Sequence, residues 1–325
     1  VFDSVFEERY IIGVGALDAD NVRAKYSTPG ASLWVSAFGG DYGVNSSYTN
    51  GSYSNSTVEV PYKPAILTTD RSSCTKGSNG SSGSRINALN DHLNPHASNP
   101  DCNYTNGMNG TSSAAPMVSG VIALMLEANA DLNWREVKHI LATEAVQVDA
   151  SFSATAISGV DYVGWVTNAA GFKFHPWYGF GAVDATAAVN SAASFTAGSL
   201  GSESVTSWND SSSESTTIDD LTNYTRNITE SGSGTIEHVK VRISFGHSLP
   251  NSLGFRLLSP SGTVSTLLPP LTAIQNNPTT EVWVYLPSNA FYGETKAGVW
   301  TLGIIDHFSG TTGTFAQWGI NFVYR

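Results

Sequence analysis

Hydrophobic and polar positions follow two different patterns along this chain, and the change between them falls near residue 195. In the first portion, short apolar runs are separated by longer apolar or amphipathic stretches. The short runs predict buried strands of a parallel sheet, because such strands are covered on both faces. They occupy residues 9–17, 33–38 and 65–70.

The longer stretches of the first portion have the spacing of helices. Residues 121–129 are apolar nearly all round and predict a buried helix, whose N-terminus is expected at Ser112. Residues 133–141 are amphipathic and predict a second helix, whose N-terminus is expected to be capped by Asp131. A short third helix is predicted over residues 183–189. Because strands alternate with helices, the first portion is expected to be an α/β domain.

The second portion alternates apolar and polar residues in short segments that are separated by hairpin turns. This pattern predicts an antiparallel β-sandwich. Residues 198–215 are rich in Ser, Gly and Thr and form either a linker or the first edge of the sandwich. We therefore expect two domains, residues 1–195 and residues 196–325. The sandwich strands are predicted at residues 238–245, 254–258, 282–286, 298–305 and 316–324.

The composition is that of a globular chain and limits its partners. Charged residues make up 13% of the 325 residues and aromatic residues 11%, which is enough to build hydrophobic cores. The net charge of −11 disfavours nucleic acid as a partner and fits a basic substrate. No apolar run is expected to be long enough to span a membrane. The sequence opens without a signal peptide or an initiator Met, as if cut from a longer chain.

The two cysteines, Cys74 and Cys102, flank a loop rich in Gly, Ser and Asn. The sequence has no Cys-x-x-Cys motif and no Cys/His cluster at zinc spacing. A single disulfide that closes the loop in an oxidising compartment is therefore favoured.

The motif Gly-Thr-Ser-x-Ala-x-Pro at residues 110–116 points to nucleophilic chemistry. Ser112 stands at the N-terminus of the predicted helix, where free N–H groups and the helix dipole favour a developing anion. Gly110 permits a sharp turn, and Pro116 is expected in the first helical turn, where its missing N–H costs nothing. A serine nucleophile needs this arrangement. The alternative is an ordinary helix cap, but the motif arises by chance at about one start position in a million.

This motif resembles the nucleophile segment of the subtilases, the subtilisin-like serine proteases. With the predicted sandwich included, the chain resembles the kexin/furin group and its bacterial secreted relatives, in which the sandwich is called the P domain. The resemblance spans nearly the whole chain. Apart from the motif, it is carried by residues 66–70, 126–135, 178–185, 258–263, 298–302 and 309–314.

The resemblance implies a secreted or periplasmic serine endopeptidase that cleaves a peptide or protein substrate after basic residues. It makes Ser112 the nucleophile and the Ser112 backbone N–H one donor of the oxyanion hole. Asp3 lies seven residues before Tyr10, where kexin-like proteases have an aspartate that binds a basic P1 side chain. The alternative for Asp3 is a solvated residue near the end of the chain.

The resemblance also implies a substrate-binding strand and a metal. The strand edge along which substrate would lie comprises Trp34, Val35, Ser36 and Ala37. Calcium is the implied metal, but Thr28 stands where these proteases usually have a Glu ligand. Threonine lacks the charge that a hard cation prefers, which puts that calcium site in doubt.

The base that would activate Ser112 is the main departure from the family pattern. Subtilases place the catalytic Asp and His and the oxyanion-hole Asn before the serine, and the resemblance places all three upstream of Val1. His92 and His96, the histidines that precede Ser112, lie in an Asn- and Pro-rich loop and are not expected to replace the base. We therefore expect a C-terminal portion that needs the N-terminal half of its catalytic domain and is nearly inactive alone. The alternative is a pseudoprotease whose P domain is a binding or stabilising module.

Overall fold

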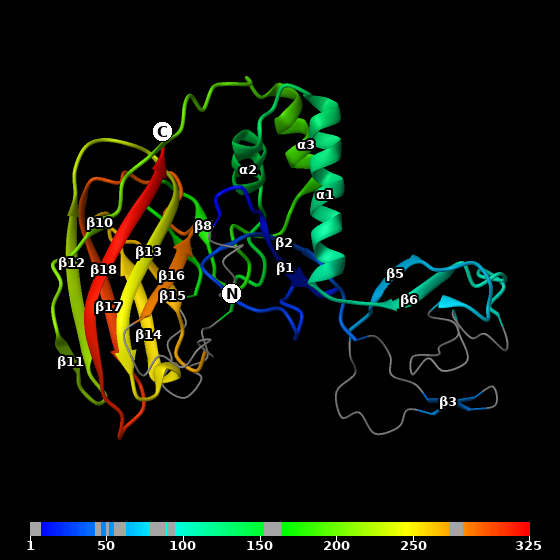
Figure 1. The fold of residues 1–325 in the computed structure, drawn as a ribbon. Helices are drawn as coiled ribbons and strands as arrows, with labels where there is room; N and C mark the ends of the chain where they lie inside the picture. Colours follow the sequence, from blue (N-terminus) through cyan, green and yellow to red (C-terminus); the bar gives the residue numbers. More distant parts are fainter. Residues whose placement is uncertain are drawn as a thin grey trace. The chain divides into compact units, whose positions relative to one another are not determined.

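A computed structural model describes residues 8–42, 47–49, 52–54, 63–77, 89, 95–152, 164–272 and 282–325 (Figure 1). The chain divides into two compact units. One unit comprises Val1–Gly13, Thr28–Val35 and Ile122–Arg325, and the other comprises Val14–Ser27 and Ser36–Val121. The predicted class, an α/β portion followed by a β-sandwich, is confirmed. The boundary expected near residue 195 stays a prediction.

The three strands predicted in the first portion are present, one with the predicted bounds and two shorter than their apolar runs. β1 (Gly13–Leu17) and β2 (Leu33–Phe38) form a two-stranded sheet. β5 (Ile66–Thr69) pairs antiparallel with β6 (Tyr104–Met108), which lies where the sequence predicts no strand. Asn and Gly within β6 disfavour a strand, so the pairing with β5 is what holds it extended.

The segment between β5 and β6 contains the predicted covalent link. Cys74 and Cys102 form a disulfide, which confirms the prediction of a closed loop. A short hairpin, β3 (Ser47–Thr49) with β4 (Ser52–Ser54), lies in the polar stretch between β2 and β5.

The three predicted helices are α1 (Thr111–Ala128), α2 (Trp134–Thr143) and α3 (Ala185–Ser194). The prediction that Asp131 caps α2 is wrong, because Asn133 is the cap. The Asn133 side chain accepts the N–H of Glu136, and the Glu136 carboxylate accepts the N–H of Asn133 in return. This reciprocal pair satisfies two N–H groups that a cap at Asp131 would leave unpaired.

The prediction that α1 is buried is also wrong for the described structure. Only 22% of the helix is buried, and Met117, Leu124 and Leu126 are 38%, 51% and 38% exposed. With 18 residues of mean hydropathy 1.3, α1 also has the length and composition of a membrane span. The prediction that no apolar run is long enough therefore does not hold, although core helices of soluble proteins meet the same test.

The second portion forms two antiparallel sheets. One has the order β10-β18-β13-β16, with β9 and β11 also paired to β18, and the other has the order β12-β17-β14-β15. Because β9 and β10 pair with β18, the Ser- and Gly-rich stretch is the first edge of the sandwich and not a linker. The strands are β9 (Ser204–Val205), β10 (Asn209–Asp210), β11 (Thr216–Ile218), β12 (Asn223–Glu230), β13 (Ile236–His247), β14 (Leu253–Leu258), β15 (Val264–Leu268), β16 (Val282–Ser288), β17 (Gly298–Asp306) and β18 (Gly313–Tyr324). Two further short strands, β7 (Val166–Thr167) and β8 (Lys173–Phe174), pair with each other before α3.

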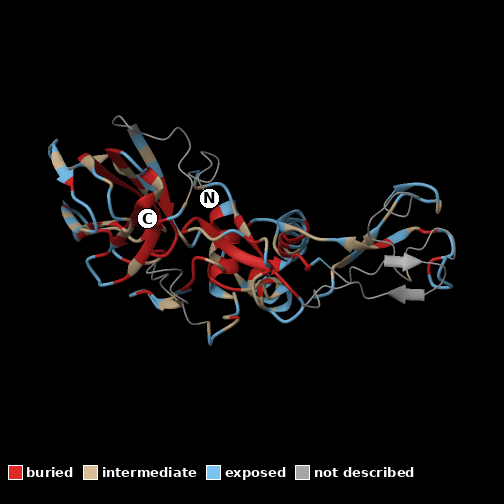
Figure 2. Ribbon diagram, turned by 90° about the horizontal axis from the view of Figure 1, so that it is seen from below, coloured by how far each residue is buried: buried red, intermediate tan, exposed pale blue. Residues whose placement is uncertain are grey.

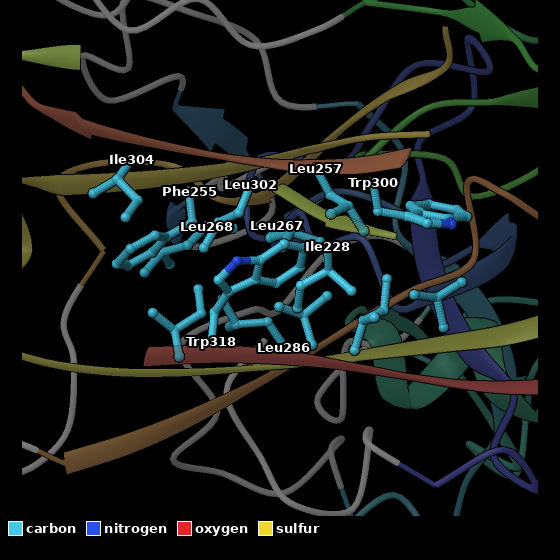
Figure 3. Close-up of a cluster of buried hydrophobic side chains, with 14 of the residues drawn as sticks. Ile228, Phe255, Leu257, Leu267, Leu268, Leu286, Trp300, Leu302, Ile304 and Trp318 are labelled. Atoms are coloured by element: carbon cyan, nitrogen blue, oxygen red, sulfur yellow. The ribbon is translucent and has the colours of Figure 1, made fainter. Parts of the chain in front are cut away.

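Side chains from the two sheets meet in one core. Figure 3 shows Phe255 and Leu302 from one sheet pointing toward Trp318 and Leu286 from the other. The inward residues of the strands are buried, as Figure 2 shows in red. Each fully buried side chain of this size contributes about 1.5–3 kcal/mol relative to exposure. Alternation of apolar and polar residues along each strand produces this core.

Residues of the sandwich also contact the first portion within the same compact unit. The side-chain amide of Asn289, just after β16, donates to the carbonyls of Ser32 and Leu33 at 2.9 and 3.2 Å. The ring of Tyr292 packs edge-on against Trp34 of β2, with the ring centroids 5.2 Å apart. The sandwich therefore fixes the start of β2 with polar and aromatic contacts.

Candidate functional site

Ser112 lies where the chain turns from β6 into α1, and its side chain is exposed. Gly110 has φ of +127°, a conformation that residues with a Cβ rarely adopt. The Gly110 carbonyl accepts the N–H groups of Ser113 and Ala114 at 2.9 and 3.4 Å and so opens the helix. Among the described residues, none accepts the N–H of Ser112 or hydrogen-bonds to its hydroxyl. Both groups therefore remain available to a ligand.

The neighbours of Ser112 on α1 differ from it in exposure and bonding. Ser113 is 8% exposed, and its buried hydroxyl has no hydrogen-bond partner among the described residues. Pro116 lies inside α1, beyond the first turn, so the prediction of its position is wrong. Because proline has no N–H, the carbonyl of Ser112 lacks its usual donor four residues later. Ser112 is thus the accessible serine of the motif.

The turn before α1 is held by Tyr26, a residue that no sequence motif singles out. The N–H of Gly110 donates to the hydroxyl of Tyr26 at 2.9 Å and to the carbonyl of Gly39 at 3.0 Å. Tyr26 is 84 residues from Gly110 along the chain. Since no local pattern connects positions so far apart, sequence reasoning missed this contact.

The predicted substrate strand has little exposed surface. Trp34, Val35, Ser36 and Ala37 are 1%, 0%, 0% and 8% exposed. The Trp34 indole donates to the carbonyl of Lys138 at 2.9 Å, and the Trp34 carbonyl accepts the N–H of Phe180 at 2.8 Å. These groups of Trp34 are therefore occupied, and substrate contact along this strand stays a prediction.

Burial strongly affects the charge of Lys138, which packs over the ring of Trp34. Its Nζ lies 4.0 Å from the ring centroid and donates to the carbonyl of Arg9 at 2.8 Å. Removal from water lowers the pKa of Lys138 to about 7, although Glu237 opposes the shift.

Two predicted residues, Asp3 and His92, lie outside the described residues. His96 is described, and its Nδ1 accepts the N–H of Ser98 at 3.1 Å. Other described histidines have partners distant in sequence from Ser112: His139 contacts Tyr292, His238 contacts Asn289, and His247 contacts Asp306. No described histidine hydrogen-bonds to Ser112. Among the described residues, Ser112 therefore has no histidine partner.

The residues around Thr28 do not fit the calcium site that the family resemblance implies. Thr28 is exposed and offers only a neutral hydroxyl. Across the described parts of the chain, no three His, Cys, Asp or Glu side chains gather in a way that could hold a metal ion. A calcium ion prefers several charged oxygen ligands.

Two family profiles match the chain. The subtilase family matches residues 7–181, and the proprotein convertase P-domain matches residues 236–322. The first match contains the Ser112 motif together with β1, β2, α1 and α2, and the second contains most of the sandwich strands.

Known proteins from bacteria and mammals are similar to this chain. The Aeromonas sobria extracellular serine protease is 32% identical over 323 residues, covering 92% of this chain and 48% of that protein. Proprotein convertase subtilisin/kexin type 6 of Rattus norvegicus is 33% identical, over 84% of this chain and 28% of that protein. The crystal structure of the Aeromonas sobria serine protease matches with a TM-score of 0.80 at 28% identity, covering 96% of this chain and 57% of that chain.

The chain thus spans about half the length of the Aeromonas sobria protease and 28% of the rat proprotein convertase. Its match to the family profile covers more than half of its own residues. The chain belongs to the subtilase family of serine proteases and combines a subtilase portion with a proprotein convertase P-domain.

Proposed function

We propose that this chain provides the nucleophile of a kexin-like serine endopeptidase, and that the nucleophile is Ser112. The observation that supports this most directly is the exposed Ser112 hydroxyl at the first turn of α1. The unpaired N–H of the same residue lies at the positive end of the helix dipole, where an oxyanion is stabilised. An ordinary helix cap would use its hydroxyl to accept a backbone N–H, and the Ser112 hydroxyl accepts none among the described residues.

The proposed reaction is acyl transfer to Ser112. Its Oγ attacks the scissile carbonyl carbon while a histidine base takes the hydroxyl proton. The tetrahedral intermediate carries its negative charge on the former carbonyl oxygen, toward which the Ser112 N–H can donate. Collapse of the intermediate breaks the C–N bond, and the protonated base returns the proton to the leaving amine. Water then hydrolyses the acyl-enzyme by the same route.

We further propose that the base comes from a part of the catalytic domain outside residues 1–325. No described histidine hydrogen-bonds to Ser112, and the relatives are about twice as long as this chain or longer. The exposed apolar side chains of Met117 and Leu124, seven residues apart on one face of α1, would be covered by that part. Exposed apolar surface of this kind marks an interface.

For the substrate, we propose a peptide or protein with Arg or Lys at P1, bound by Asp3. The net charge of −11 agrees with a basic substrate. Cleavage of matched peptides with Arg, Lys or Leu at P1 tests this preference. The completed enzyme should cleave the first two at least about tenfold faster than the third, and Asp3→Asn should reduce that ratio. Equal cleavage of all three peptides would remove the Asp3 assignment.

The disulfide between Cys74 and Cys102 supports a secreted or periplasmic location. The relative from Aeromonas sobria is an extracellular protease, which agrees with this proposal.

Peptide hydrolysis by serine variants tests the nucleophile. In the completed catalytic domain, Ser112→Ala should lower kcat by at least about ten-thousand-fold. Ser119→Ala is the matched control, because Ser119 is an exposed serine of the same helix whose hydroxyl donates to the Ala115 carbonyl at 3.1 Å. The control should retain activity. Activity that survives in Ser112→Ala would contradict the proposal and favour the non-catalytic alternative.

A further inference from the structure

The hydroxyl of Tyr26 lies where two distant segments of the chain meet. It is 2.7 Å from the carbonyl oxygen of Gly39 and 2.6 Å from that of Gly40, just after β2. On its other side, it is 2.9 Å from the backbone nitrogen of Gly110, two residues before Ser112. A phenol has one proton and two lone pairs. It therefore accepts the Gly110 N–H and shares its own proton between the two carbonyls.

The junction around this hydroxyl has no spare room. A Cβ on Gly39 would lie 2.7 Å from the Tyr26 hydroxyl and 2.8 Å from the Gly110 carbonyl oxygen. The Gly110 N–H also donates directly to the Gly39 carbonyl at 3.0 Å. The end of β2 and the turn before α1 are thus fixed to each other through backbone groups, and the hydroxyl of Tyr26 occupies the space between them.

Gly110 determines the direction in which α1 begins. Its carbonyl accepts the first N–H groups of the helix, and its φ of +127° sets the path of the chain into Thr111 and Ser112. A rotation of the Gly110 peptide would therefore move the Ser112 hydroxyl and N–H together. The Gly110 N–H resists this rotation through its two hydrogen bonds, one to the Tyr26 hydroxyl and one to the Gly39 carbonyl.

We infer that Tyr26 is a positioning residue, whose hydroxyl holds the Gly110 turn so that Ser112 presents its hydroxyl and N–H in the reactive geometry. This inference rests on the proposed role of Ser112. Tyr26 does not touch the reacting atoms and acts through Gly110. Burial raises the pKa of the Tyr26 phenol, so the hydroxyl keeps its proton at neutral pH.

The rate at which a fluorophosphonate modifies Ser112 in the completed catalytic domain tests this role. Tyr26→Phe should lower the second-order rate of modification about tenfold, because a small displacement of a nucleophile costs one to two orders of magnitude. With a short peptide substrate, kcat should fall by a similar factor while KM stays within about twofold.

Tyr178→Phe is the matched control for the loss of a tyrosine hydroxyl. The Tyr178 hydroxyl donates to Asp149 at 2.8 Å, and the ring is fully buried. This variant should unfold at a lower temperature than the parent. The fluorophosphonate should modify Ser112 of this variant at the same rate as in the parent. Equal rates of modification for the parent and Tyr26→Phe would overturn the inference. Absence of modification in the parent would instead remove the nucleophile assignment, and the positioning role with it.

A second measurement covers the case in which Tyr26→Phe does not fold. Replacing Tyr26 with 3,5-difluorotyrosine keeps the ring and the hydroxyl but lowers the pKa of the phenol. A phenolate cannot donate to the carbonyls of Gly39 and Gly40, so modification of Ser112 should slow at a lower pH than in the parent. If the Tyr26 hydroxyl only supported the fold, the fall in the modification rate at alkaline pH would occur at the same pH in both proteins. That result would overturn the inference.

Discussion

The guanidinium of Arg135, in the first turn of α2, makes two hydrogen bonds to the carboxylate of Glu237 on β13. Nε lies 2.7 Å from Oε2, and Nη2 lies 2.6 Å from Oε1. The two side chains are only 9% and 8% exposed. This buried ion pair joins the subtilase portion to the P-domain within one compact unit. A charge that loses its partner here cannot regain water.

Removal of one member of this pair should destabilise the protein strongly. Arg135→Met leaves the Glu237 carboxylate buried, with Arg325 3.7 Å away as a weaker partner. We expect a loss of about 3 kcal/mol in the free energy of unfolding, measured by urea denaturation. Arg226→Met is the control, because Arg226 and its partner Glu214 are 26% and 29% exposed. That variant should lose about 1 kcal/mol or less. Equal losses in the two variants would show that the buried pair has no special role.

His175 should make the protein sensitive to acid. Its Nδ1 accepts the N–H of Trp177 at 3.0 Å, and burial lowers its pKa to about 3. Because the folded pKa lies below the ordinary value of 6.5, the stabilisation is present above pH 6.5 and falls as the pH drops toward 3. Between pH 7 and pH 5 this group should remove about 2 kcal/mol of the free energy of unfolding.

The comparison for His175 uses denaturation curves at both pH values. His175→Asn keeps an acceptor near the Trp177 N–H but does not titrate, so it should lose less stability on acidification than the parent. His96→Asn, at an exposed position, should behave as the parent does. The same acid loss in all three proteins would refute the assignment.

Lys138 should make the free energy of unfolding increase as the pH rises above 7. Its pKa in the folded state is about 7, below the ordinary value of 10.5, so only the unfolded chain binds this proton between those values. Stability due to Lys138 should therefore rise by about 2 kcal/mol from pH 7 to pH 9. In Lys138→Met this rise should be absent, whereas exposed Lys173→Met should retain it. A rise of the same size in Lys138→Met would contradict the prediction.

The core between the two sheets should be sensitive to cavities. Leu302 of β17 is fully buried in the core between the two sheets, whereas Val299 on the same strand is 48% exposed. Leu302→Ala should cost about 2–5 kcal/mol of the free energy of unfolding, because the removed methyl groups leave a cavity. Val299→Ala should cost about 0.5 kcal/mol or less. Urea denaturation measures the free energy of unfolding of both variants, and we expect their m-values to equal that of the parent.

Most elements of the fold could be predicted from the sequence because their apolar spacing is regular. The long strands β13, β16, β17 and β18 alternate apolar and polar residues and contain the predicted segments. β12 was not predicted, because Asn223–Glu230 has few apolar residues and owes its extended form to pairing with β17. Register with a distant partner is not a local property of a sequence.

At the site too, features with a local sequence signal could be predicted, and features that depend on distant segments could not. The motif around Ser112 indicates a nucleophile because helix termini and glycine turns have local sequence signals. The exposure of α1 could not be predicted, since an apolar helix reveals its length and composition but not what covers it. The contact of Tyr26 with Gly110 depends on two segments 84 residues apart that only the folded chain brings together.

The most direct measurement of the central claim is the position of the covalent adduct after reaction with a fluorophosphonate. The 325-residue chain, completed with the proposed remainder of its catalytic domain, would be modified, digested and analysed by mass spectrometry. A single adduct on Ser112, absent from Ser112→Ala and retained in Ser119→Ala, is the predicted result. An adduct on another residue, or none in the active complex, would contradict the assignment of Ser112 as the nucleophile.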